Sequence, residues 1–178
     1  MLIWNIGGAA DPNSGSACMI EMSKAFGALL QTGWQPKRTI VFASWDAEEY
    51  GLVGSTEWVE EYVPWIKEAN VAYINLDTAV SGSVPEISAT PDFHAIAIEA
   101  MKKVVFPYHG VANVTLYDVW TESGTGNVGV LGSGSDYTAF LHNNGISSID
   151  ISASRGPEDP IYHYHSNYGM FLSHSHTA

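Results

Sequence analysis

The sequence is poor in cysteine and in basic residues, and each shortage excludes a class of function. Cys18 is the only cysteine among 178 residues, which rules out an internal disulfide and a thiolate zinc cluster. Lysine and arginine number 7 against 19 acidic residues, and the formal net charge of −12 argues against nucleic acid or an anionic membrane as a partner. Neither a bilayer-spanning apolar run nor a signal-peptide pattern is present. A metal site would therefore use histidine, aspartate and glutamate.

The remaining composition and the apolar patterning predict a globular α/β fold. Apolar residues make up 46% of the chain, and its length suits a single domain. We expect strands at residues 39–45, 71–76 and 146–151, helices at 16–30, 51–61, 91–105 and 136–141, and a long irregular segment at 108–135. The strands are β-branched and aromatic, as in sheets covered on both faces. Their alternation with helices predicts a three-layer α/β/α sandwich with a mostly parallel central sheet.

Acidic residues follow two of the predicted strands. Glu48 and Glu49 come directly after the strand at 39–45, and Asp77 follows the strand at 71–76. Ligands of open α/β sheets bind beyond the carboxyl ends of the strands, so these three carboxylates would share one edge. Their mutual repulsion indicates a bound cation. The alternative for the two glutamates is a solvated acidic helix start, and for Asp77 a turn at a strand end.

Two further candidate ligands lie at turns near the ends of the chain. Asp11 precedes Pro12 in a turn cluster, where it could also act as a helix N-cap. His165 belongs to a Tyr-His repeat in which His163 is its rival, a packed neighbour if His165 is the ligand. Together with the three strand-end acids, these residues form the inventory of a two-zinc hydrolytic site.

Five segments, in order along the chain, resemble the peptidase domain of the M28 zinc metallopeptidases. The resemblance is strongest to the branch of glutamate carboxypeptidase II and the transferrin receptor. The segments are residues 7–15 (GGAADPNSG), 42–58 (FASWDAEEYGLVGSTEW), 73–77 (YINLD), 131–136 (LGSGSD) and 164–168 (YHSNY). The resemblance implies a zinc-exopeptidase-like fold that hydrolyses peptide substrates, with two zinc ions as cofactors.

The same resemblance implies a role for each candidate residue. Asp11 would bridge the two zinc ions, Glu49 and His165 would complete one of them, and Asp77 would bind the other. Glu48 would be the catalytic general base, taking a proton from the attacking water and passing it to the leaving amine. The implied reaction is that of an exopeptidase of the carboxypeptidase kind.

The sequence departs from the family pattern at one zinc ligand. Family members take a histidine from a His-x-Asp motif upstream of the bridging aspartate. Counted from Asp11 and Trp4, that histidine would fall just before Met1, and the accompanying acid is replaced by an apolar residue near Leu2. Single or incomplete zinc occupancy is one expectation from this gap. The alternative function is a non-catalytic or inactive relative that serves as a structural or interaction domain.

Other departures concern the substrate and the extent of the domain. Asp150 and Ser152 lie where an arginine cluster for an acidic substrate would be sought, and Gly169 replaces a common acid. Residues 1–178 are interpreted as one partial, N-terminally truncated M28-like domain without a protease-associated or dimerisation domain, so the implied homodimer lacks its usual contact. The resemblance suggests a secretory, vacuolar or extracellular location, on which glycosylation at the sequon of Asn113 would depend.

A glycine pattern at residues 124–129 (GTGNVG) matches the dinucleotide fingerprint and supplies a competing hypothesis. A true fingerprint follows a strand and opens a helix. The flanking residues predict neither element here, so nucleotide binding is the weaker interpretation.

Overall fold

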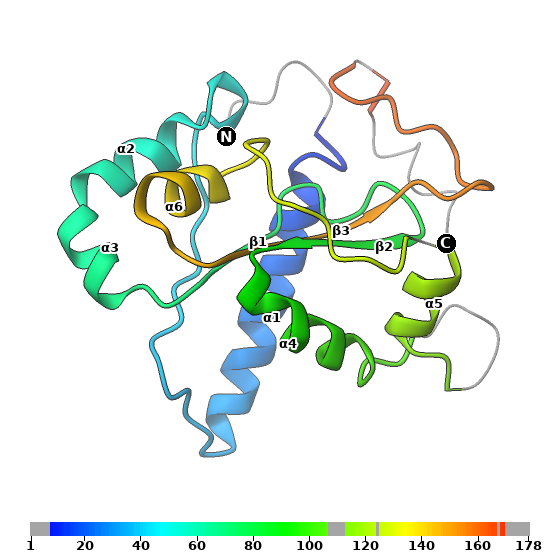
Figure 1. Ribbon diagram of the computed structural model, residues 1–178, viewed down its shortest axis with the longest axis horizontal. Helices are drawn as coiled ribbons and strands as arrows, with labels where there is room; N and C mark the ends of the chain where they lie inside the picture. The colour runs from blue at the N-terminus through cyan, green and yellow to red at the C-terminus, as the bar shows by residue number, and fades with distance from the viewer. Residues whose placement is uncertain (1–7, 107–112, 124, 167, 170–178) are drawn as a thin grey trace.

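The computed structural model describes residues 8–106, 113–123, 125–166 and 168–169 (Figure 1). The elements are α1 (Asn13–Gln31), the 3-10 turn η1 (Glu48–Tyr50), α2 (Val53–Glu61), α3 (Val63–Ala69), β1 (Tyr73–Asn75), β2 (Val84–Ala89), α4 (Pro91–Met101), α5 (Leu116–Ser123), α6 (Tyr137–Asn144) and β3 (Ser148–Ser154). All four predicted helices are confirmed as α1, α2, α4 and α6, with shifted ends. The strands expected at 71–76 and 146–151 are confirmed as β1 and β3.

The three strands form a small mixed sheet in the order β1-β3-β2. β1 runs parallel to β3, with Asn75 opposite Asp150, whereas β2 runs antiparallel to β3, with Ala89 opposite Ile149. The α/β class is therefore confirmed, but the sheet among the described residues is mixed rather than mostly parallel. β2 was not predicted, because Pro85 and the small polar residues around it obscure the strand pattern.

Residues 39–45, predicted to be a buried strand, belong to no strand of the structure. Their side chains are largely open to solvent: Val41 is 63% exposed and Phe42 42%. No strand within the described ranges pairs with this segment. A β-branched run favours an extended backbone, but a strand also needs a neighbouring strand to hydrogen-bond with. The tertiary fold, not the local sequence, determines whether that neighbour is present.

Helix α5 lies inside the segment predicted to be irregular. Its start carries a local signal, because the backbone N–H of Thr115 donates to the Asp118 carboxylate and the Asp118 N–H donates back to Thr115 Oγ1. This reciprocal bonding is a capping-box arrangement, which the spacing Thr-x-x-Asp could have indicated. The glycine pattern at 124–129 thus follows a helix instead of the strand that a dinucleotide fingerprint requires.

Two apolar clusters hold the helices around the sheet. Figure 1 shows α4 and α5 on one side of the strands and α2, α3 and α6 on the other. On the first side, Trp120 packs with Ile87 and Ile149, and on the second, Phe140 packs with Val59 and lies under Tyr73 with ring centroids 4.1 Å apart. Within the described ranges, no helix is both long and apolar enough to cross a bilayer.

Helix α1 is joined to the sheet at its first turn. The Gly15 N–H donates to the carbonyl oxygen of Asp77 over 3.1 Å, and Ser14 Oγ accepts from the Val80 N–H over 3.1 Å. Gly15 is buried, and a Cβ added there would lie 2.3 Å from the carbonyl oxygens of both Leu76 and Asp77. The absence of a side chain at Gly15 therefore lets α1 approach the strand end that carries Asp77.

Replacing Gly15 by alanine is expected to destabilise the fold by about 1–3 kcal/mol, since backbone atoms would have to move to admit the methyl group. Gly27, in the same helix, is the matched control, because nothing lies within 4 Å of a Cβ placed there. Gly27→Ala should stabilise by up to about 1 kcal/mol through helix propensity. Urea unfolding of both variants measures the difference, and equal effects would contradict the close approach at Gly15.

Candidate metal centre

An unusual backbone conformation presents the two adjacent glutamates. Glu48 and Glu49 lie in η1, between Ala47 with φ 56° and Leu52 with φ 60°, both in the left-handed region that side chains other than glycine seldom adopt. Backbone hydrogen bonds hold this turn, including those from Gly51 and Leu52 to the Glu48 carbonyl oxygen at 3.0 and 2.8 Å. Such strained positions persist where the surrounding structure imposes them, often at functional sites.

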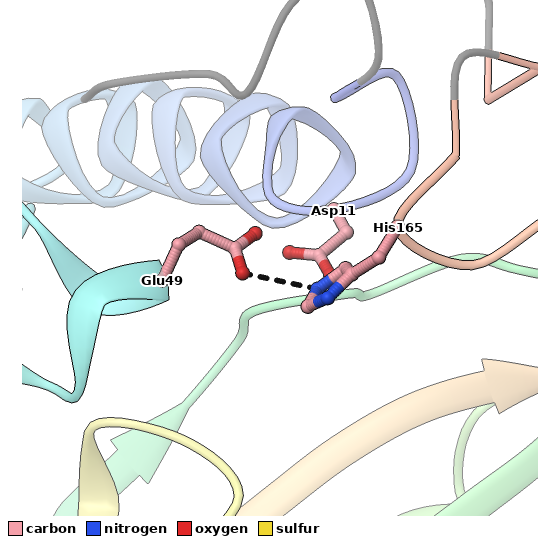
Figure 2. A group of neighbouring side chains, drawn as sticks. All are labelled: Asp11, Glu49 and His165. Atoms are coloured by element: carbon pink, nitrogen blue, oxygen red, sulfur yellow. Dashed lines mark ion pairs between the residues drawn. The ribbon is translucent and has the colours of Figure 1, made fainter.

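Asp11, Glu49 and His165 meet at one point although they are far apart in the sequence (Figure 2). His165 Nε2 lies 3.0 Å from Glu49 Oε2 and 3.3 Å from Asp11 Oδ2. One potential ligand atom from each residue lies within 4.8 Å of the other two. The carboxylates are largely covered, with side-chain exposures of 10% for Asp11 and 20% for Glu49, while the imidazole is 46% exposed.

The loop after β3 brings His165, and not His163, to these carboxylates. His165 has φ 50° and its ring stacks on that of Tyr164 at 3.7 Å between centroids. Both the N–H and the hydroxyl of Ser166 donate to the His163 carbonyl oxygen, which closes a tight turn around His165. The His163 ring instead lies near that of Tyr168, at 5.5 Å.

The donor set of this cluster suits zinc. Two carboxylate oxygens and one imidazole nitrogen are ligands that zinc accepts at about 2.0–2.2 Å, which places neighbouring donors of a tetrahedral site roughly 3.3–3.6 Å apart. The two pairs that His165 forms, at 3.0 and 3.3 Å, are close to that spacing. Asp11, Glu49 and His165 could therefore hold one zinc ion with little rearrangement.

Asp77 lies next to this cluster without being part of it. Its carboxylate contacts that of Asp11, and its charge helps to raise the pKa of Asp11. Asp77 Oδ2 also accepts a hydrogen bond from Ser135 Oγ over 2.7 Å. Asp11 thus lies close both to His165 within the cluster and to the Asp77 carboxylate beside it.

The carboxylates crowd one another and lie partly out of water, so their proton affinities rise. Burial, followed by the charges of Asp77 and Asp136, raises the pKa of Glu48 to about 8. Burial, Asp77 and Glu49 together raise the pKa of Asp11 to about 7. These groups carry a repulsion that a cation would relieve.

Asp136 is a member of this acidic group to which the sequence reasoning assigned no role. Burial raises its pKa to about 6, and its buried Oδ1 atom has no hydrogen-bond partner among the described residues. The segment LGSGSD that contains Asp136 was recognised as a motif, but nothing in it indicates which side chains reach the other carboxylates.

Two cavities adjoin the site, and Asp11, Glu48 and Asp77 line both. The larger, of about 1330 Å³, lies between α1, residues 39–45 and β1 and is mostly apolar. The smaller, of about 270 Å³, is polar, and its wall includes Glu86 and Asp150. A substrate in the smaller cavity would lie directly beside the site carboxylates.

Comparison with known proteins finds a family match over most of the chain. Residues 4–174 match the profile of peptidase family M28. The chain is 64% identical to a "Probable glutamate carboxypeptidase" of Arthroderma benhamiae over 169 residues, which are 94% of this chain and 23% of that protein. It is 43% identical to a "Probable glutamate carboxypeptidase" of Arabidopsis thaliana, over 88% of this chain and 23% of the relative. It is 42% identical to aminopeptidase NAALADL1 of Mus musculus, over 82% of this chain and 21% of the relative. The chain thus spans less than a quarter of the length of these relatives.

Proposed function

Because this chain belongs to peptidase family M28, we propose that it carries the metal centre of a zinc-dependent exopeptidase, with Glu48 as the general base. The observation that carries the proposal is the convergence of Asp11, Glu49 and His165 within 4.8 Å, with Glu48 on the same turn as Glu49. Asp77 would serve the second metal position, and Asp11 would be shared by both.

Zinc, when bound, supplies a Lewis acid for the scissile carbonyl and lowers the pKa of the attacking water. Glu48 accepts the proton of that water. In the metal-free chain its pKa of about 8 keeps it protonated near neutrality, and a cation among its neighbours favours the ionised form that can act as a base. Glu48, protonated by that step, can then act as a general acid and deliver the proton to the leaving amine nitrogen.

The proposed substrate is a peptide. An acidic substrate residue would need a positive partner. The described wall of the smaller cavity contains no lysine, arginine or histidine and does contain Glu86 and Asp150, so this cavity gives no support for a preference for glutamate, whereas Arg38 lies in the wall of the larger cavity. The word glutamate in the names of two relatives belongs to those proteins. The adjacent polar cavity is instead compatible with neutral or basic residues.

A second candidate is a non-catalytic relative that keeps the scaffold as an interaction domain. The observation that favours it is the surroundings of the Asp77 side chain. Among the described residues, its carboxylate lies near Ser135, Asp11 and other acids, whereas His165 groups with Glu49. The metal position beside Asp77 therefore has fewer ligands than the position beside His165.

The zinc content of the chain separates the two candidates. After incubation with excess zinc at neutral pH and gel filtration, we expect at least one zinc ion per chain by elemental analysis, since three donors already converge. Two ions per chain would contradict the non-catalytic candidate outright. A chain that retains no zinc under these conditions would contradict the proposed enzyme.

A further inference from the structure

We propose that Asp150, Asn75 and Ser135 form a hydrogen-bonded chain that positions Asp77 for its metal. The proposal rests on the proposed metal centre and deepens it, because it names the residues that orient one ligand. Ser135 hydrogen-bonds to Asp77, Asn75 to Ser135, and Asn75 also to Asp150. They are positioning residues that act through Asp77.

The hydrogen bonds diverge from the Asn75 amide, one branch leading through Ser135 to Asp77 and the other ending at Asp150. Ser135 Oγ donates to Asp77 Oδ2 over 2.7 Å, and Asn75 Nδ2 donates to Ser135 Oγ over 3.0 Å and to Asp150 Oδ1 over 2.9 Å. A hydroxyl has one proton and an amide nitrogen has two, so all three protons are used. The serine proton must therefore point to Asp77, which secures one carboxylate oxygen and leaves the other for a ligand role.

Burial makes this arrangement rigid. Asn75 is 3% exposed and Ser135 5%, so water cannot readily replace either partner. Turning the Asn75 amide over would aim its carbonyl oxygen at the Asp150 carboxylate, an unfavourable contact between two acceptors. Only the observed orientation satisfies both neighbours.

The fold fixes each member of the chain independently of the metal. Asn75 ends β1 and lies opposite Asp150 in the parallel pairing with β3. Ser135 lies just before α6. Two hydrogen bonds fix its backbone, because its carbonyl oxygen accepts from both the N–H and the hydroxyl of Thr138. Sheet register and a helix start thus set the position of Asp77 Oδ2.

This arrangement predicts a measurable effect on metal binding. Partners that hydrogen-bond to metal-ligating side chains orient them, and their loss costs about 10–100-fold in metal affinity. Ser135 and Asp150 also line the smaller polar cavity, so the chain connects the metal ligand to the wall that a substrate would contact.

The test compares zinc affinities of variants of the 178-residue chain by competition with a chelator. Ser135→Ala should lower the affinity of the weaker zinc site by about 10–100-fold, whereas Ser135→Thr, which keeps the hydroxyl, should stay within about 3-fold of the parent. Ser23→Ala, on the exposed surface of α1 and outside the walls of both cavities, is the matched control and should leave the zinc affinity unchanged. The melting temperature of each metal-free variant shows whether the fold is retained. An unchanged affinity in Ser135→Ala, or no rescue by threonine, would overturn the proposal.

A double-mutant cycle tests the connection between the members. Asn75→Ala should weaken zinc binding as Ser135→Ala does, and the double variant should lose little more, because both changes break one chain. Fully additive losses of zinc affinity in the double variant would overturn the proposed connection between Asn75 and Ser135.

Nuclear magnetic resonance of the metal-free chain separates this proposal from the proposed function. The two Asn75 side-chain amide protons should exchange slowly with solvent, and Ser135→Ala should shift one of them. If the parent chain binds no zinc, the metal centre fails while these signals still report the hydrogen bonds. Fast-exchanging amide protons at Asn75 would overturn the chain itself.

Discussion

Replacing Glu48 by glutamine is expected to lower kcat for peptide hydrolysis by about 10²–10⁴-fold, the usual contribution of a positioned general base. Glutamine has nearly the same shape but cannot accept the proton of the attacking water. Glu48 is outside the group formed by Asp11, Glu49 and His165, so the variant should bind zinc as the parent does. In the metal-free chain Glu48 is protonated near neutrality, and the glutamine side chain is neutral as well, so the melting temperature of the metal-free variant should not fall.

Steady-state kinetics with zinc content measured on the same samples checks this expectation. Glu57→Gln, on the exposed surface of α2, is the matched control and should keep full activity. A Glu48→Gln variant as active as the parent would remove Glu48 from the mechanism. A variant that loses zinc together with activity would make Glu48 a ligand instead of a base.

Replacing His165 by alanine is expected to weaken zinc binding by more than about 100-fold, because the loss of an outer partner alone costs 10–100-fold. His165 provides the nitrogen that lies 3.0 Å from Glu49 and 3.3 Å from Asp11. Without it, the two carboxylates would hold a cation through oxygen atoms alone. Zinc should then lose its advantage over magnesium, which prefers oxygen ligands.

The matched control for His165 is two residues away. His163→Ala alters a histidine with a similar sequence context whose ring lies near Tyr168. Its zinc affinity should equal that of the parent in the same chelator competition. Equal losses in the two variants would mean that the loop as a whole, and not the His165 imidazole, supports the site.

The helices were largely predictable because their signals are local. Thr90 and Pro91 start α4 as expected, although the Thr90 hydroxyl bonds to the backbone of Ser148 in β3 and caps no backbone N–H of α4. The end of α4 was predicted too late: the helix stops at Met101, because Val104 and Phe106 hydrogen-bond with Leu116 and Val114. Hydrogen bonds to another segment of the chain thus ended the helix where helix propensity alone would have continued it.

The strands were less predictable because each needs a neighbour. Residues 39–45 have a strong strand pattern but pair with no strand in the part of the chain that the structure describes, while β2 has a weak pattern and pairs with β3 along its length. Pairing partners are chosen by the whole fold, and the local pattern carries no information about them.

For the candidate site, the sequence alone determined the chemistry: which acids and histidines are present, their order, and the family motifs that contain them. The match of residues 4–174 to peptidase family M28 bears out the resemblance read from those motifs. The assignment of Asp11, Glu48, Glu49, Asp77 and His165 to individual roles stays a prediction.

Only the tertiary structure decided which of these groups meet. It brought His165 rather than His163 to Asp11 and Glu49, and it joined Asn75 and Ser135, 60 residues apart, beside Asp77. It also placed Glu48, half-buried, among other acids, which raises its pKa to about 8. Residue identity and local backbone preference are properties of the sequence itself. The distances between side chains and their shielding from water arise only when distant segments pack together.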